Sequence, residues 1–278
     1  MKFGEKTKIK TLRMYSSFQL AKKYLKYYFT AGNGKGHGIH SPFIFDFIIH
    51  VLNDKKKYDC YEKIELLRNN LLKNKVEIEV EDFGAGSAVI PFKTRKIKDI
   101  AGSSLKQKKF AQLLFRIAKY YQSKTIVELG TSFGITTCYL ASANKTSMVY
   151  TLEGAKNIAG IATKTFEKAG LKNIFLTEGN FEKTLPSFLK KIENVDLLFI
   201  DGNHRKKATL DYFEAFLQKS TTQSIFIFDD IHWSKEMEDA WELIRQHDSV
   251  TLTIDFFFIG LVFFSKDFKV KQNFTIRF

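Results

Sequence analysis

The sequence predicts an α/β protein with a Rossmann-like, mostly parallel seven-stranded sheet, a C-terminal antiparallel hairpin and a mainly helical N-terminal extension. Three observations predict this fold class. From residue 125 onward, short apolar runs alternate with helical stretches, as in βαβ units. A glycine-containing turn follows the first of these runs, and two β-rich runs lie close together near the end of the chain. We therefore expect an extension over residues 1–103 and an α/β domain over residues 104–278.

The first 121 residues contain four segments in which apolar residues recur at helical spacing. These predicted helices are 17–29, 43–52, 58–72 and 110–121. A glycine-rich loop at 31–42 separates the first two. Residues 76–80 alternate like a short strand, and the turn-rich EDFGAGS that follows at 81–87 is expected to be a loop, because the residues after it include Pro91 and lack a helical apolar period.

The domain is expected to contain five parallel strands and one hairpin. Short apolar runs of strand length predict the five, at 125–129, 148–152, 173–177, 195–200 and 224–228. Residues 250–258 and 261–264 are two further β-rich runs, separated only by Ile259 and Gly260. Runs this close in sequence are expected to pair as an antiparallel hairpin.

Composition excludes several classes of protein. With 44% hydrophobic residues the chain can bury a large core, so disorder throughout is excluded. The longest nearly apolar run, 254–264, contains Asp255 and is too short to span a bilayer, so no membrane segment is expected. Cys60 and Cys138 lack the spacing of zinc or redox sites, and a cytoplasmic location is expected.

The positive net charge is concentrated in the first part of the chain. Residues 1–120 contain 25 Lys or Arg against 11 Asp or Glu, whereas residues 121–278 contain 19 of each kind. A surface of this charge suits nucleic acid, anionic lipid or an acidic substrate. Only seven of the 44 basic residues are Arg, however, and a lysine-rich surface is also typical of an ordinary solvated face. Both interpretations remain open at this point.

A glycine turn after the first predicted strand indicates a nucleotide-type ligand. The run TIVELGTSFGITT places an apolar strand before Glu128-x-Gly130-x-x-x-Gly134, and a helix begins near Ile135. Glycines allow close approach of backbone to a ligand, and a helix N-terminus offers free N–H groups. Glu153 ends the next strand, where a carboxylate can accept hydrogen bonds from ribose hydroxyls. The glycine spacing differs from G-x-G-x-x-G and disfavours NAD or FAD.

These residues resemble the first two motifs of class I S-adenosylmethionine-dependent methyltransferases. The resemblance covers roughly residues 104–264 and implies S-adenosylmethionine as cofactor. It implies that Glu153 holds the ribose, that Glu128 helps to position the amino group and that Asn180 and Phe181 contact the adenine. The residues expected to line the methionine part are Gly130, Thr131, Ser132 and Gly134.

Three aspartates follow the fourth and fifth predicted strands, whose carboxyl ends open on the same sheet edge as the glycine turn. They are Asp201, Asp229 and Asp230. Carboxylates this close repel each other unless a cation or protons offset their charge, and oxygen ligands favour Mg²⁺ or another hard divalent cation. The alternative is that Asp201 and Asp229 only cap loops and that Asp230 faces water.

The same cluster is similar to that of the metal-dependent catechol and caffeoyl-CoA O-methyltransferase group, in which an Asp-Asn pair stands where this chain has Asp229-Asp230. His204 lies three residues after Asp201, where that group has a catalytic lysine, so His204 and Asp201 are the expected catalytic residues. His204 is alternatively a loop histidine or a hydrogen-bond partner of the substrate. Trp233 and the segment KKFAQLL at 108–114 also resemble the group.

The resemblance implies methyl transfer to a hydroxyl of a small or medium-sized acceptor, and it leaves open an anionic acceptor and assistance by a divalent metal. Class I methyltransferases carry additions that select the substrate, so residues 1–103 are expected to form a substrate or cap region, with Lys35, His37 and His40 near an anionic group. Two alternatives remain: an RNA-modifying methyltransferase that grips phosphates with the basic extension, and a non-catalytic protein that only binds the cofactor. The sequence leaves the oligomeric state open.

Overall fold

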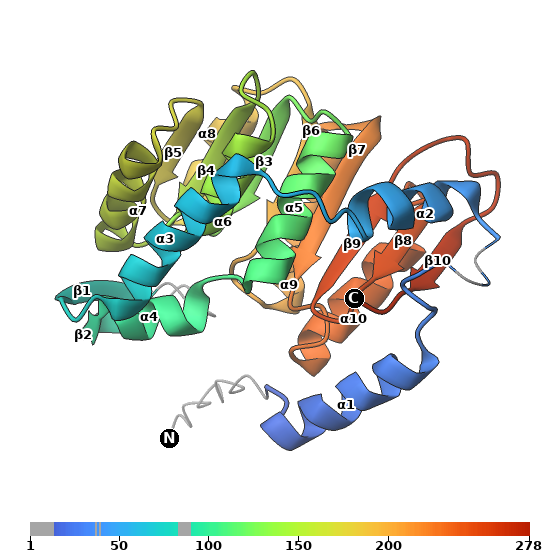
Figure 1. Ribbon diagram of the computed structural model, residues 1–278, viewed down its shortest axis with the longest axis horizontal. Coiled ribbons are helices and arrows are strands. Elements are labelled where there is room, and N and C mark those ends of the chain that lie inside the picture. The colour runs from blue at the N-terminus through green and yellow to red at the C-terminus, as the bar shows by residue number, and fades with distance from the viewer. Residues whose placement is uncertain (1–13, 37, 39, 83–89) are drawn as a thin grey trace, which may run out of the picture.

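The computed structural model describes residues 14–36, 38, 40–82 and 90–278 and contains a three-layer α/β fold (Figure 1). Its central sheet has the strand order β10-β8-β9-β7-β6-β3-β4-β5. The strands are β3 Thr125–Leu129, β4 Met148–Glu153, β5 Ile174–Glu178, β6 Val195–Ile200, β7 Ser220–Asp229, β8 Leu252–Asp255, β9 Ile259–Phe263 and β10 Gln272–Thr275. The predicted Rossmann-like α/β fold is therefore confirmed.

Strand direction separates the sheet into two parts. The five strands from β5 to β7 are parallel, whereas β9 runs antiparallel to both β7 and β8. The predicted C-terminal hairpin is thus confirmed as β8 and β9. The prediction of seven strands was one too few, because β10 adds an edge strand parallel to β8. Its sequence, QNFT, is too short and polar to show a strand pattern.

Alternating side chains on the strands build two hydrophobic cores, one on each face of the sheet. On β6, Leu197 and Phe199 face one cluster while Leu198 and Ile200 face the other. Every residue of this strand except Asp196 is buried, as expected for a strand covered by helices on both faces.

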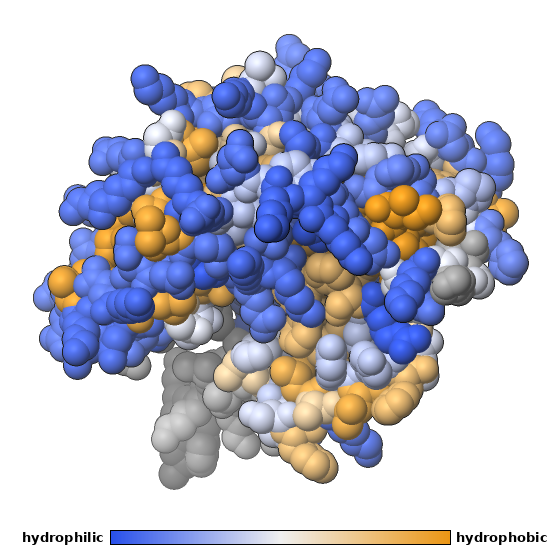
Figure 2. Space-filling model, viewed as in Figure 1, coloured by the Kyte–Doolittle hydropathy of each residue, from blue (hydrophilic) through white to orange (hydrophobic). Residues whose placement is uncertain are grey.

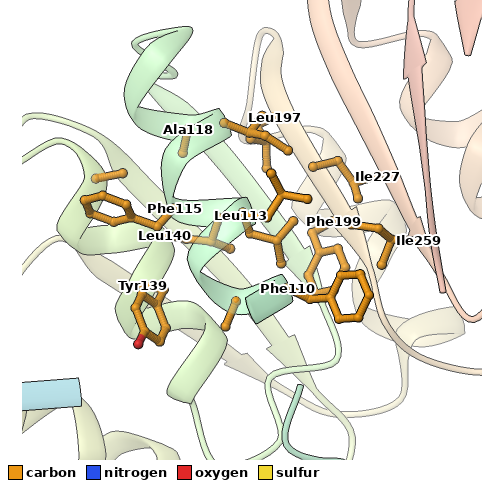
Figure 3. Close-up of a cluster of buried hydrophobic side chains, with 14 of the residues drawn as sticks. Phe110, Leu113, Phe115, Ala118, Tyr139, Leu140, Leu197, Phe199, Ile227 and Ile259 are labelled. Atoms are coloured by element: carbon orange, nitrogen blue, oxygen red, sulfur yellow. The ribbon is translucent and has the colours of Figure 1, made fainter. Parts of the chain in front are cut away.

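The helices cover these two faces. Their bounds are α1 Ser17–Thr30, α2 Pro42–Phe47, α3 Asp59–Lys73, α4 Ile97–Ser104, α5 Lys108–Tyr120, α6 Ile135–Ala143, α7 Lys156–Ala169, α8 Phe181–Leu189, α9 Lys206–Leu217 and α10 Lys235–Gln246, with a π-helical turn at Ile48–Leu52 after α2. One cluster contains side chains of α3, α5, α6 and α7, and the other contains side chains of α8, α9 and α10. Figure 3 shows Phe110 and Leu113 of α5 packed on Phe199 of β6.

The extension over residues 1–103 is helical as predicted, with an additional small sheet. Strand β1 (Glu77–Asp82) pairs antiparallel with β2 (Ile90–Lys96). The second of these strands was not predicted from the sequence. Residues 83–87 of the expected loop lie outside the described residues. Pro91 in a two-stranded sheet is compatible with pairing because each strand has a free edge.

Helix α1 lies against the C-terminal part of the chain rather than over α3 and α4 (Figure 1). The Tyr27 hydroxyl donates to the carbonyl oxygen of Ile276 at 2.5 Å, and Lys23 pairs with Glu238 at 2.9 Å. Figure 2 shows hydrophobic side chains gathered over the lower part of this face, and α1 carries exposed Phe18 and Phe29. No helix in the described ranges is both long and apolar enough to cross a membrane.

Candidate active site

A cavity of about 810 Å³ opens where the parallel strands end. Chain order reverses between β3 and β6, and ligands of open α/β sheets bind in the crevice at such a switch point. The lining includes residues from the ends of β3, β4, β6 and β7 and from the extension. Among them are Arg95, Ser104, Lys106, Phe110, Gly130, Ser132, Glu153, Asn180, Phe181, Asp201, His204, Asp229, Asp230, Trp233 and Phe258.

The glycine turn is shaped by the backbone that packs against it. Gly130 has a φ of +103°, and a Cβ atom there would lie 2.0 Å from the carbonyl oxygen of Asp201. Gly134 has a φ of +78°, and a Cβ atom there would lie 2.3 Å from the ring of Phe166. Only glycine fits at either position without movement of the neighbours. Gly130 thus lets the turn after β3 lie directly on the end of β6, and Gly134 lets it lie against Phe166 of α7.

Glu153 joins the turn to the end of β4. Its carboxylate accepts hydrogen bonds from the backbone N–H of Ser132 at 2.8 Å and of Ala155 at 3.0 Å. Burial raises the pKa of this carboxyl group above its ordinary value. The side chain also lines the cavity, so it can accept hydrogen bonds from a ligand while it fixes the turn.

Glu128 lies beneath the turn and does not line this cavity. It is fully buried, and its carboxylate accepts hydrogen bonds from the hydroxyls of Thr137 and Thr151. Burial raises the pKa of Glu128 to about 7. Its Oε1 atom has no hydrogen-bond partner among the described residues. Thr131 and Gly134 are likewise absent from the cavity lining, and the Thr131 hydroxyl contacts the Thr151 hydroxyl at 2.6 Å.

Asn180 and Phe181 line the cavity at the start of α8. The Asn180 side chain accepts from the backbone N–H of Glu182 at 2.8 Å and caps the helix. The Phe181 ring packs edge-on against Tyr212, and a Cβ atom on Gly202 would lie 3.0 Å from it. A flat aromatic side chain beside a polar amide suits a planar heterocycle.

The three predicted aspartates do converge, together with a lysine that the sequence analysis did not select. The Lys106 ammonium group forms an ion pair with the Asp229 carboxylate, and both side chains are nearly buried. Burial alone would raise the pKa of Asp229, but the adjacent Lys106 ammonium holds it below its ordinary value. Burial and then the Asp229 carboxylate raise the pKa of Asp201, and burial raises that of Asp230 to about 6.

His204 faces the same cluster from the loop after β6. Its Nε2 atom lies 3.7 Å from Asp201 Oδ1 and 4.0 Å from Asp230 Oδ2. Its side chain is 30% exposed, so it is open to the cavity rather than enclosed in the core. The geometry lets this imidazole take up a proton next to two carboxyl groups that stabilise the resulting charge.

Lys106 gave no signal in the sequence because it is one of three lysines in the polar segment LKQKKF. Its ion pair with Asp229 follows only from its position between α4 and α5. The aromatic wall formed by Phe110, Trp233 and Phe258 was anticipated only at Trp233.

The glycine-rich loop of the extension lies elsewhere. His40, Ser41 and Phe43 line a second cavity of about 830 Å³ with the C-terminal residues 272–276. The two cavities share no lining residue within the described ranges, so the expected approach of Lys35 and His40 to the active-site cavity was wrong. His37, expected to act with them, lies outside the described residues. The extension instead reaches the first cavity through Arg95 and α4.

Comparison with known proteins finds similarity to methyltransferases. Residues 127–231 match a family model described as a methyltransferase domain. A catechol O-methyltransferase from Niastella koreensis is 32% identical over 128 residues, which are 45% of this chain and 56% of that enzyme. The chain thus matches little more than half the length of that relative.

Solved structures of O-methyltransferases share the fold. One from Bacillus cereus, in complex with SAH, superposes with a TM-score of 0.54 at 20% identity and covers 77% of this chain and 95% of that chain. TomG from Streptomyces achromogenes, in complex with SAM, has a TM-score of 0.54 at 16% identity and covers 76% and 91%. The family model and the catechol O-methyltransferase relative confirm the predicted resemblance to methyltransferases, and the solved structures show the same fold.

Proposed function

We propose that this protein is an S-adenosylmethionine-dependent O-methyltransferase that acts on a hydroxyl group of a small or medium-sized acceptor. One observation carries the proposal: the cavity at the switch point contains both the Glu153 and glycine-turn wall and the cluster of Asp201, His204 and Lys106. A cofactor and an acceptor would therefore meet in a single cavity.

The wall of the glycine turn suits S-adenosylmethionine. Glu153 would accept hydrogen bonds from the ribose hydroxyls, and Asn180 and Phe181 would contact the adenine. Gly130 and Ser132 would lie along the methionine part through their backbone. Thr131, Gly134 and Glu128 would support this wall from behind, and Glu128 would reach the amino group only if the turn moved. When bound, this cofactor supplies an electrophilic methyl group on a positively charged sulfur.

His204 would act as the general base and Asp201 as its partner. The Nε2 atom would take the proton of the acceptor hydroxyl, and the Asp201 and Asp230 carboxyl groups would stabilise the charged imidazole. The acceptor oxygen would then bond to the methyl carbon while the carbon–sulfur bond breaks and its electron pair stays on sulfur. The cavity contributes by holding the two reactants in line.

The residues expected to bind a divalent metal do not fit that role as they are arranged. Asp229 is already paired with the Lys106 ammonium group. Within the described part of the chain, no group of three or more His, Cys, Asp or Glu side chains is arranged to hold a metal ion. We therefore route no step of the reaction through a metal at Asp201, Asp229 and Asp230.

Residues 1–103 would act as the cap region that selects the acceptor, while residues 104–278 would form the catalytic domain. This division is supported by Arg95 and Ser103, which line the cavity from the extension side. Arg95 also supports an anionic acceptor, because it is exposed and always charged. A cytoplasmic location is supported by Cys60 and Cys138, which are both free thiols.

The test is transfer of a labelled methyl group from S-adenosylmethionine into cell extract separated into metabolites, RNA and protein. The proposal expects label in metabolites, with loss of transfer in His204→Gln. Label in RNA would favour the RNA-modifying alternative, with the 25 basic residues of the first 120 as the contact surface. Binding of S-adenosylhomocysteine without transfer into any fraction would favour a non-catalytic binding protein.

A further inference from the structure

Lys106 is held in place by contacts on both of its sides. The Arg68 guanidinium of α3 donates from Nη1 to the carbonyl oxygen of Lys106 at 2.7 Å and from Nε to Glu65 at 2.9 Å. The next residue, Gln107, is the N-cap of α5 and accepts from the backbone N–H of Phe110 at 3.0 Å. The backbone of Lys106 is therefore fixed, so its side chain extends toward the cluster from a held position.

The ion pair of Lys106 and Asp229 is largely shielded from water. Its side chain is 11% exposed and that of Asp229 only 2%. The Asp229 carboxylate stabilises the charged form of Lys106 most strongly, and Asp201 and Asp230 stabilise it further. One ammonium group thus faces three carboxyl groups in a region where charges are poorly screened.

A divalent cation in the same place would meet two obstacles. It would lie beside a fixed positive charge, and it would lose Asp229 Oδ2 as a ligand because that atom is already paired. The remaining buried oxygen, Asp229 Oδ1, has no hydrogen-bond partner among the described residues. Asp229 could therefore offer a metal only this one oxygen.

We propose that the Lys106 ammonium group takes the place of the divalent cation in this carboxylate cluster, so that the protein binds cofactor and acceptor without a metal ion. This inference rests on the proposed function, but it concerns whether the site requires a metal ion. Because Lys106 also lines the cavity, its ammonium group contacts the acceptor oxygen as it becomes negative and stabilises that charge.

The test is Mn²⁺ binding, measured by electron paramagnetic resonance on the full-length protein, for the wild type and for Lys106→Ala. The wild type is expected to show no Mn²⁺ site, and EDTA is expected to change neither its affinity for S-adenosylhomocysteine nor its methyl transfer. Removal of the ammonium group leaves three carboxyl groups around a space, so Lys106→Ala is expected to gain Mn²⁺ affinity by about tenfold or more. Lys106→Ala combined with Asp229→Asn is expected to lose that gain.

Lys109→Ala is the matched control because it removes an exposed lysine of the same segment that contacts Phe110 and Phe278 instead of the aspartates. It is expected to leave Mn²⁺ binding unchanged. A wild-type Mn²⁺ site of one ion per chain that Asp229→Asn abolishes would overturn the inference. That result stands even if Lys106→Ala fails to fold. Absence of S-adenosylhomocysteine binding would instead refute the proposed function. The two outcomes are distinguishable because Mn²⁺ binding is measured without the cofactor.

Discussion

Replacement of Gly130 by alanine tests whether the contact between the turn after β3 and the end of β6 shapes the cofactor wall. The new Cβ atom would lie 2.0 Å from the Asp201 carbonyl oxygen, whereas ordinary contacts are about 3.5 Å. The two backbones would have to separate by roughly 1.5 Å. The backbone N–H of Asp201 is bonded to the Leu129 carbonyl at 2.8 Å, so β6 resists that movement.

The cost has two parts. Overpacking typically costs about 1–3 kcal/mol, and a φ of +103° in a residue with a side chain adds about 1–3 kcal/mol. We expect the free energy of unfolding of Gly130→Ala to fall by about 2–6 kcal/mol, a large part of the total stability of a typical domain. Any folded protein should bind S-adenosylhomocysteine about a hundredfold more weakly, because the turn no longer lies where Glu153 holds it.

Denaturant unfolding and isothermal titration calorimetry with S-adenosylhomocysteine measure the two effects. Gly160→Ala is the matched control, because it lies within α7 and its new Cβ atom would meet nothing within 4 Å. That variant should gain up to about 1 kcal/mol in stability and keep its affinity. The reasoning is refuted if Gly130→Ala is as stable as this control and binds equally well.

Three further predictions concern single side chains. Glu153→Ala should weaken binding of S-adenosylhomocysteine by about 10- to 100-fold in calorimetry, since it removes charge-assisted hydrogen bonds to the ribose and to the Ser132 backbone; unchanged affinity would place the ribose elsewhere. His204→Gln should lower kcat by about 10²- to 10⁴-fold with little change in that affinity, and an unchanged kcat would exclude it as the base. His232 lies between Asp255 at 2.8 Å and Glu238 at 3.1 Å, and although burial opposes its charge, these two carboxylates raise its pKa to about 9. The resulting stabilisation of the folded state, about 3 kcal/mol, should be complete below pH 6.5 and be lost as pH rises through 9. Denaturant unfolding at a series of pH values should show this loss in the wild type and not in His232→Phe.

The parallel strands could be predicted from the sequence because their apolar runs are buried on both faces. The expected 125–129 and 195–200 agree with β3 and β6 to the residue. Strands β2 and β10 could not be predicted in this way. Their segments are short or polar, and their pairing depends on partners that the local pattern does not reveal.

The site residues that could be predicted from the sequence are those that lie at the ends of strands. Asp201, Asp229 and Glu153 end strands of one sheet, so topology alone brings them to one edge. Lys106 lies between two helices, and its side chain reaches Asp229 across 123 residues of sequence. A lysine among other lysines carries no local sign of such a contact, and the positive charge that the cluster requires was therefore assigned to a metal.

Titration of the purified wild-type protein with S-adenosylhomocysteine, in the presence of EDTA, tests the central claim most directly. A cavity built from the glycine turn and Glu153 predicts saturable binding of one molecule per chain, competed by S-adenosylmethionine and weakened in Glu153→Ala. No measurable binding at millimolar ligand, or binding that Glu153→Ala leaves unchanged, would contradict the account.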